Sequence, residues 1–191
     1  MLKNIKIKVL IVSLILVLSL TACSNYDSPQ ENSSNQTSKS SNVSSTKSEE
    51  WGSMAVKLRD SFTLEEMLVY AIQDEYLARA EYEEVINKFG ENRPFTSIIK
   101  AEETHIKLLT PLFEKYNIPI PTDRAKDYVV VPETFEEVLK IGVKAEIDNI
   151  AMYEKFLKQK DLPEDIKDVF MKLKNASENH LKAFQNSLSN Q

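Results

Sequence analysis

The sequence predicts an all-α fold, and three observations support this. Only three of the 191 residues are glycine. Long stretches are rich in Ala, Leu, Glu and Lys, which are strong helix formers. No long run alternates polar and apolar residues, as a half-buried strand would. The length suits one folded domain preceded by a terminal segment.

Residues 1–22 are typical of an export signal. Three lysines precede an apolar run that is too short for a comfortable membrane-spanning helix of about 20 apolar residues. Leu20-Thr21-Ala22-Cys23 then resembles the lipobox of bacterial lipoproteins. The resemblance implies that Cys23 is lipidated and anchors the protein to the membrane, on the extracytoplasmic side of the bacterial cell envelope. A plain signal peptide or an uncleaved anchor is the alternative.

Residues 23–50 are dominated by serine and asparagine. Such a composition buries too little apolar surface to offset chain entropy, so we expect a disordered tether before a folded domain at residues 51–191. The single cysteine excludes an internal disulfide framework and a zinc–thiolate site within one chain. The net charge is −5, and no basic stripe carries interleaved aromatic residues, so we expect no nucleic-acid partner.

The first predicted helix covers residues 64–89. Thr63 and Glu66 form a capping-box pattern at its start, and Gly90 follows its end. Glu75 falls in the middle of the apolar face of this helix. Because an unpaired buried carboxylate is costly, Glu75 requires an Arg or His partner, a raised pKa, or a metal ion.

The second predicted helix covers residues 94–117, with Pro94 tolerated in its first turn. Glu102 and His105 lie three residues apart within its apolar stripe, so they project from one face. Glu-x-x-His is a ligand pattern of metal-carrying helical bundles. A long, proline-containing connection follows.

The third and fourth predicted helices cover residues 135–160 and 162–188. Thr134 and Glu137 form a second capping-box pattern. Glu146 interrupts the apolar face of the third helix, and His180 falls on the apolar face of the fourth. Both histidines of the protein are therefore expected to face inward.

The two halves of the domain repeat one pattern. Glu75 precedes Tyr82 by seven residues, Glu146 precedes Tyr153 by seven, and a helix with an inward histidine follows each. Pairing the halves around a two-fold axis would bring five ligand candidates together. These candidates are Glu75, Glu102, His105, Glu146 and His180. Carboxylate and imidazole ligands suit iron or manganese, and also zinc.

Two segments resemble known ferritin-like proteins. Residues 75–82 are similar to the rubrerythrin pattern Glu-x-x-Ala-Arg-x-x-Tyr. Residues 177–184 are similar to Ser-x-Asn-His-Leu-x-Ala-Phe, found in an uncharacterised bacterial family of exported ferritin-like domains. The resemblance covers about residues 61–188.

This resemblance implies an antiparallel, ferritin-like four-helix bundle built from two helix-pair repeats with a long connection between them. It implies iron as the cofactor and a diiron-type oxidoreductase, acting on ferrous iron, peroxide or oxygen. By analogy it also suggests a homodimer. The sequence identifies neither the substrate nor the electron donor.

One departure from the family pattern leaves alternatives open. Ser177 stands where a second Glu-x-x-His motif requires a glutamate. The five groups could hold two metal ions with an added water on Ser177, one ion, or none. Tyr82 and Tyr153 are then core residues or hydrogen-bond partners of the ligands, and Arg79 pairs with a buried acid. The alternative function is a metal-free helical bundle that serves as a cell-surface binding or scaffold module.

Overall fold

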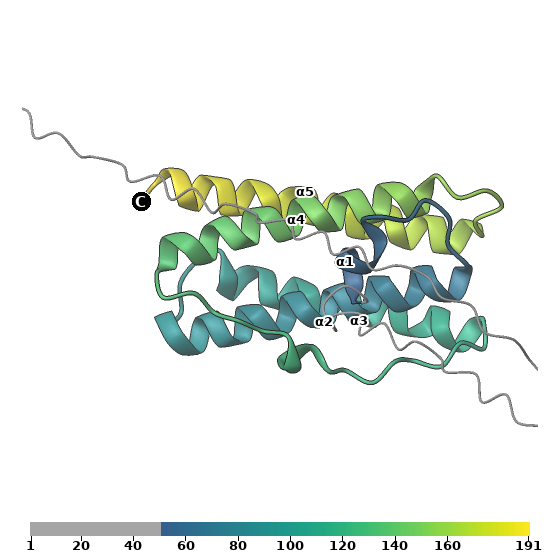
Figure 1. Cartoon of the computed structure of the whole chain (residues 1–191), viewed down its shortest axis with the longest axis horizontal. Coiled ribbons are helices and arrows are strands. Elements are labelled where there is room, and N and C mark those ends of the chain that lie inside the picture. Colours follow the sequence, from purple (N-terminus) through teal and green to yellow (C-terminus); the bar gives the residue numbers. More distant parts are fainter. Residues whose placement is uncertain (1–50) are drawn as a thin grey trace, which may run out of the picture. The chain divides into compact units, whose positions relative to one another are not determined.

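The computed structural model describes residues 51–191, and this part of the chain is all-α and contains no strand. The expected signal, Cys23 and tether lie outside the described residues. Figure 1 shows the helices, whose bounds are α1 (Gly52–Val56), α2 (Leu64–Phe89), α3 (Phe95–Lys115), α4 (Phe135–Leu157) and α5 (Glu164–Ser189). A short 3₁₀ turn, η1 (Ala125–Asp127), lies in the connection between α3 and α4.

The four long helices pack in two pairs. α2 packs along α3, and α4 packs along α5. The pairs meet where α2 contacts α4 and α3 contacts α5, while α1 contacts both α2 and α4. Within residues 51–191, no helix combines the length and the apolar composition needed to cross a membrane.

Local side-chain chemistry fixes several helix ends. Both capping boxes are confirmed: the hydroxyls of Thr63 and Thr134 accept from the backbone N–H groups of Glu66 and Glu137, whose carboxylates accept in return. Each box satisfies backbone donors that the first helical turn leaves unpaired. Gly90 ends α2 at φ 84°, a conformation that glycine adopts without strain.

The other ends differ by a few residues from the expected ones. α4 ends at Leu157 and α5 begins at Glu164, and in the connection between them Asp161 has a left-handed φ of 57°, which is incompatible with a continuous helix. Pro163 caps α5 without a side-chain hydrogen bond. α1 was not predicted from the sequence. Trp51 precedes it, donates from its indole Nε1 to the Gln73 carbonyl at 3.2 Å, and is buried.

Two apolar clusters occupy the interior, and on α3, α4 and α5 the predicted ligands lie between them. On α3, Phe95 and Ile98 belong to one cluster, and Leu109 and Phe113 belong to the other. The polar segment of α3 that contains Glu102 separates them. The apolar clusters therefore hold the polar centre in place from both sides.

Candidate metal centre

The structure brings all five predicted ligands together in the interior. Glu75 comes from α2, Glu102 and His105 from α3, Glu146 from α4 and His180 from α5. Their exposed fractions are only 2 to 8%. Burying three carboxylates is costly unless each has a strong partner, so the contacts within the cluster decide what it can do.

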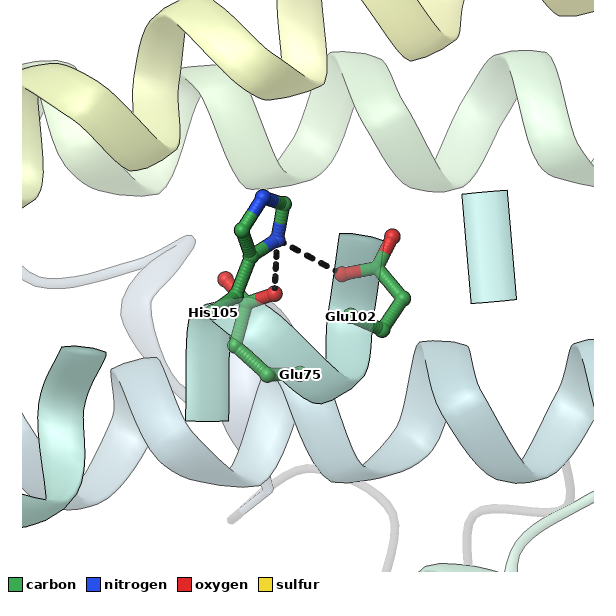
Figure 2. A group of neighbouring side chains, drawn as sticks. All are labelled: Glu75, Glu102 and His105. Atoms are coloured by element: carbon green, nitrogen blue, oxygen red, sulfur yellow. Dashed lines mark hydrogen bonds and ion pairs between the residues drawn. The ribbon is translucent and has the colours of Figure 1, made fainter. Parts of the chain in front are cut away.

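The first group contains Glu75, Glu102 and His105 (Figure 2). The Nδ1 atom of His105 lies 3.0 Å from Glu75 Oε2 and 2.9 Å from Glu102 Oε2. The Glu-x-x-His spacing on α3 places the imidazole beside its own carboxylate, and α2 adds the second carboxylate from across the helix pair.

The second group contains Glu102, Glu146 and His180. His180 Nδ1 lies 3.2 Å from Glu102 Oε1 and 3.4 Å from Glu146 Oε1. Glu102 thus turns one oxygen toward each histidine, and it belongs to both groups. The two imidazole rings lie with their centroids 5.5 Å apart and an angle of 25° between their planes.

Two tyrosines connect the halves reciprocally. The Tyr153 hydroxyl on α4 donates to Glu75 Oε1 on α2 at 2.7 Å. The Tyr82 hydroxyl on α2 donates to Glu146 Oε1 on α4 at 3.0 Å. Each phenol therefore orients the carboxylate of the opposite half, as hydrogen-bond partners of ligating carboxylates commonly do.

Both groups have a donor set that could hold a metal ion. In each, one atom from every residue lies within 4.8 Å of the others. Three carboxylates and two imidazoles match the preferences of iron, manganese and zinc. The buried donor set therefore fits a metal site, although it leaves the identity of the metal open.

The electrostatics of the metal-free cluster favour protonated histidines. Burial alone would lower the pKa of His105, but hydrogen bonds to Glu102 and Glu75 raise it to about 10. The same balance, with Glu102 and Glu146 as partners, raises the pKa of His180 to about 9. A metal ion binds neutral imidazole, so it must displace these protons.

The three carboxylates respond differently to burial. Burial, and then the nearby charge of Glu102, raises the pKa of Glu75. Burial also raises the pKa of Glu146. For Glu102 burial acts in the same direction, but the hydrogen bonds from both histidines outweigh it and lower the pKa. Glu102 is therefore the carboxylate that stays ionised most readily, which suits the one ligand common to both groups.

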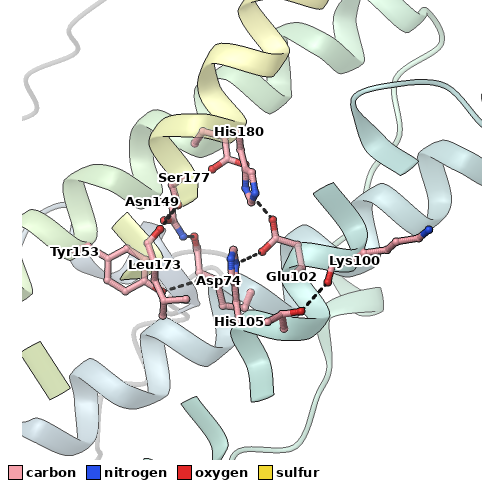
Figure 3. A network of polar contacts seen from close by, with 12 residues as sticks. Asp74, Lys100, Glu102, His105, Asn149, Tyr153, Leu173, Ser177 and His180 are labelled. Carbon is pink, nitrogen blue, oxygen red and sulfur yellow. Dashed lines mark hydrogen bonds and ion pairs between the residues drawn. The ribbon is translucent and has the colours of Figure 1, made fainter. Parts of the chain in front are cut away.

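Ser177 belongs to a separate buried chain of hydrogen bonds beside the cluster (Figure 3). Its hydroxyl donates to Asn149 Oδ1 at 2.6 Å, and Asn149 Nδ2 donates to Asp74 Oδ2 at 2.6 Å. Asp74 Oδ1 accepts from the backbone N–H of Ser53 in α1 at 2.7 Å. Where the repeat would place a fourth carboxylate, the chain thus has a polar link from α5 through α4 and α2 to α1.

Arg79 lies elsewhere than expected. Its guanidinium pairs with Asp123 at 2.6 Å, in the connection between α3 and α4, and lies over the ring of Tyr76. Both charged side chains are about one third exposed. Arg79 therefore neutralises a surface acid rather than a carboxylate of the cluster. Glu178 likewise pairs with Lys174 along α5, outside the cluster.

Sequence reasoning missed the roles of Asp74 and Asn149. Asn149 lies three residues after Glu146 in the apolar stripe of α4, so a polar residue at a buried helix position was the available signal. Asp74 directly precedes Glu75, and in the sequence it resembles a solvent-exposed residue beside a buried one, yet only 9% of it is exposed. No local pattern distinguishes such a residue, because its partners lie on α4 and α1.

Comparisons with known proteins identify relatives of this chain. Residues 65–191 match the family described as "Uncharacterized protein domain (DUF2202)". Uncharacterized protein MJ0754 of Methanocaldococcus jannaschii is 34% identical over 140 residues, which are 65% of this chain and 75% of that protein. The crystal structure of hypothetical protein MJ0754 from Methanococcus jannaschii is similar, with a TM-score of 0.59, at 31% identity over 69% of this chain and 84% of that one.

Proposed function

The chain belongs to the DUF2202 family, and we propose that this member holds two divalent metal ions, iron or manganese, in its buried centre. The observation that carries the proposal is the position of Glu102. Its two oxygens face two different histidines, and each histidine has a further glutamate beside it. A carboxylate shared by two Glu/His groups is the arrangement that joins a pair of ions.

Each residue has a part in this proposal. Glu75 with His105 would hold one ion, Glu146 with His180 would hold the other, and Glu102 would contact both. Ferritin-like di-metal proteins use a Glu from each of two helices and a Glu-x-x-His motif from each of the other two. This chain matches that plan at every position except Ser177, which supports a ferritin-like bundle with one carboxylate fewer.

We propose redox chemistry as the activity. Bound iron would supply one-electron exchange with oxygen or peroxide, and the missing carboxylate would leave room for a small ligand. The tyrosine hydroxyls would hold the terminal carboxylates in position. Ferrous oxidation and peroxide consumption, followed in the loaded protein and in its metal-free form, test this activity.

We also propose that Cys23 tethers the domain to the extracytoplasmic side of a bacterial membrane. The lipobox-like residues 20–23 support this. Metabolic labelling with a radioactive fatty acid tests the proposal, because the label should enter the wild-type protein and be absent from Cys23→Ala. Equal labelling of the two proteins would reject lipidation at this residue.

One observation favours a second candidate, a metal-free binding or scaffold module. Among the described residues, no buried side-chain nitrogen or oxygen lacks a hydrogen-bond partner. The Glu–His pairs thus satisfy one another without an ion, as a polar core network does.

Metal content distinguishes the two candidates. The protein is purified without an affinity tag, reconstituted separately with iron, manganese and zinc, desalted and analysed for bound metal. Two ions per chain in the wild type, falling to about one in His105→Ala because His105 belongs to one group only, would support the di-metal centre. One ion would indicate a half-site. None with any of the three metals would leave the metal-free module.

A further inference from the structure

A small cavity lies directly beside the buried ligands. Its volume is about 20 Å³, and its walls include Glu75, Glu102, Glu146 and Ser177. A space of this size accommodates about one water molecule. We call it the inner cavity. It touches the carboxylates of both metal-binding groups, so an ion in it would be within reach of all three.

A larger opening lies outside the inner cavity, between α2 and α4. Its volume is about 170 Å³, and α1 contributes Ser53 and Met54 to its wall. We call it the outer opening. The two spaces share Asp74, Ala78 and Ala145 as lining residues, so they adjoin at these side chains.

The two alanines explain why the helices leave a passage here. Ala78 follows Glu75 by three residues on α2, and Ala145 directly precedes Glu146 on α4. Each side chain is one methyl group. A larger side chain at either position would occupy the space that joins the inner cavity to the outer opening.

The outer opening also carries an unneutralised acid. Glu81 lines it, and within residues 51–191 no cationic side chain pairs with this carboxylate. Asp148 and Lys144 line it too, but they pair with each other, and Asp148 also pairs with Lys57. Burial, followed by the charges of Asp74 and Glu146, raises the pKa of Glu81 to about 7. A cation that passes Glu81 would relieve this repulsion.

We propose that divalent metal ions reach the buried centre through the outer opening, past Glu81 and then between Ala78 and Ala145. This inference rests on the proposed function, because it assumes that the centre binds metal. Beyond the proposed function, the inference specifies the route by which metal ions enter and the class of solute that this route admits. The path admits small cations and excludes organic molecules, since the inner cavity is about the size of one water molecule.

Uptake kinetics test the path. The full chain is stripped of metal and mixed with ferrous iron without oxygen, and unbound iron is trapped over time by a chromogenic chelator. In Ala145→Leu, uptake should slow about tenfold or more, because passage then requires the helices to separate locally. Final stoichiometry should remain that of the wild type, since no ligand is changed. Ala151→Leu, at an exposed position on α4, is the matched control and should load at the wild-type rate.

Glu81→Gln tests the electrostatic part independently. Removing the carboxylate should slow uptake several-fold at low salt, and the difference should shrink at high salt, where charges are screened. Circular dichroism melting curves verify that each variant is folded.

The outcomes separate the two proposals. Normal stoichiometry with an unchanged uptake rate in Ala145→Leu would overturn the path and leave the metal centre standing. An equal slowing in Ala151→Leu would also overturn it, because the effect would then not depend on the path. Failure of the wild-type protein to bind either iron or manganese would overturn the metal centre, and the path with it.

Discussion

Replacing Glu102 with glutamine is the most direct perturbation of the proposed centre. The substitution keeps the volume of the side chain but removes its charge and turns one acceptor oxygen into an NH₂ donor. Glu102 lies 2.9 Å from His105 Nδ1 and 3.2 Å from His180 Nδ1. In the glutamine variant, one of these protonated rings faces another donor.

The cost to the metal-free protein follows from these contacts. Of two charge-assisted hydrogen bonds, each worth about 1.5–3 kcal/mol, at most one remains, from a protonated ring to the amide oxygen of the glutamine, so about one such bond is lost. Glu75 and Glu146 remain beside the histidines, so neither ring becomes an unpaired buried charge. We therefore expect a loss of about 2–3 kcal/mol in the free energy of unfolding, below the cost of orphaning a buried ion.

The effect of Glu102→Gln on metal content should be larger than its effect on stability, and it should differ from the effect of replacing a ligand of one group. Because Glu102 belongs to both groups, Glu102→Gln should abolish binding of both ions after reconstitution with manganese. Glu146→Gln is the matched control, since Glu146 belongs to one group only. It should retain about one ion per chain, because the Glu75–His105 half is intact.

Urea unfolding of the metal-free proteins and elemental analysis of the reconstituted ones provide the two measurements. Wild-type metal content in Glu102→Gln would refute the shared role of this carboxylate. So would identical losses in Glu102→Gln and Glu146→Gln, because a centre without a common ligand makes no distinction between them.

Three further predictions concern the two histidines, Ser177 and Gly142. The metal-free protein should lose stability as pH rises from about 7 to 10. The reason is that the folded protein raises the pKa of His180 from 6.5 to about 9 and the pKa of His105 from 6.5 to about 10. The stability that the protonated histidines provide is complete below pH 6.5. It decreases by about 1.4 kcal/mol per pH unit for each histidine and is lost once the pH exceeds the folded-state pKa. Urea unfolding at several pH values measures this loss. Ser177→Ala should lower stability by about 1–2 kcal/mol, because Asn149 Oδ1 loses its donor, and metal content measured in parallel should not change. Gly142→Ala should cost about 1–3 kcal/mol in thermal unfolding, because its methyl group would lie 2.6 Å from the ring of Phe184.

Each of these predictions has a clear contrary result. Metal-free stability that stays constant or rises between pH 7 and 10 would contradict protonated histidines. Loss of metal in a folded Ser177→Ala protein would show that the serine acts at the centre and not only through Asn149. Unchanged stability in Gly142→Ala would mean that Phe184 moves aside freely.

The burial and clustering of the candidate ligands could be predicted, because helix periodicity leaves few choices for the residues that face the interior. Glu75, Glu146 and His180 each interrupt an apolar stripe with an ionisable group, which is costly unless partners exist. The Glu-x-x-His spacing added Glu102. The two capping boxes were equally local, since two residues three positions apart hold all of the donors and acceptors of each box.

Other features depend on contacts that local patterns do not encode. Arg79 is on the same helix as Glu75, but its long side chain reaches Asp123, and the path of the connection that carries Asp123 has no periodic signature. The chain from Ser177 to Asp74 joins three helices, so it depends on how each is rotated about its axis. α1 is too short to show a helical period, and Trp51 is recognisable as its anchor only through Gln73.

The reciprocal tyrosine bonds also fix the register of α2 against α4. The two bonds pair Glu75 with Tyr153 and Tyr82 with Glu146, so rising numbers on one helix match falling numbers on the other. On both helices the bonded residues are seven apart, a rise of about 10.5 Å. Both bonds can therefore form only at one longitudinal offset, and sliding either helix by a turn, about 5.4 Å, would break the two together. The two tyrosines therefore set the longitudinal offset of α2 against α4, whether or not an ion lies between the halves.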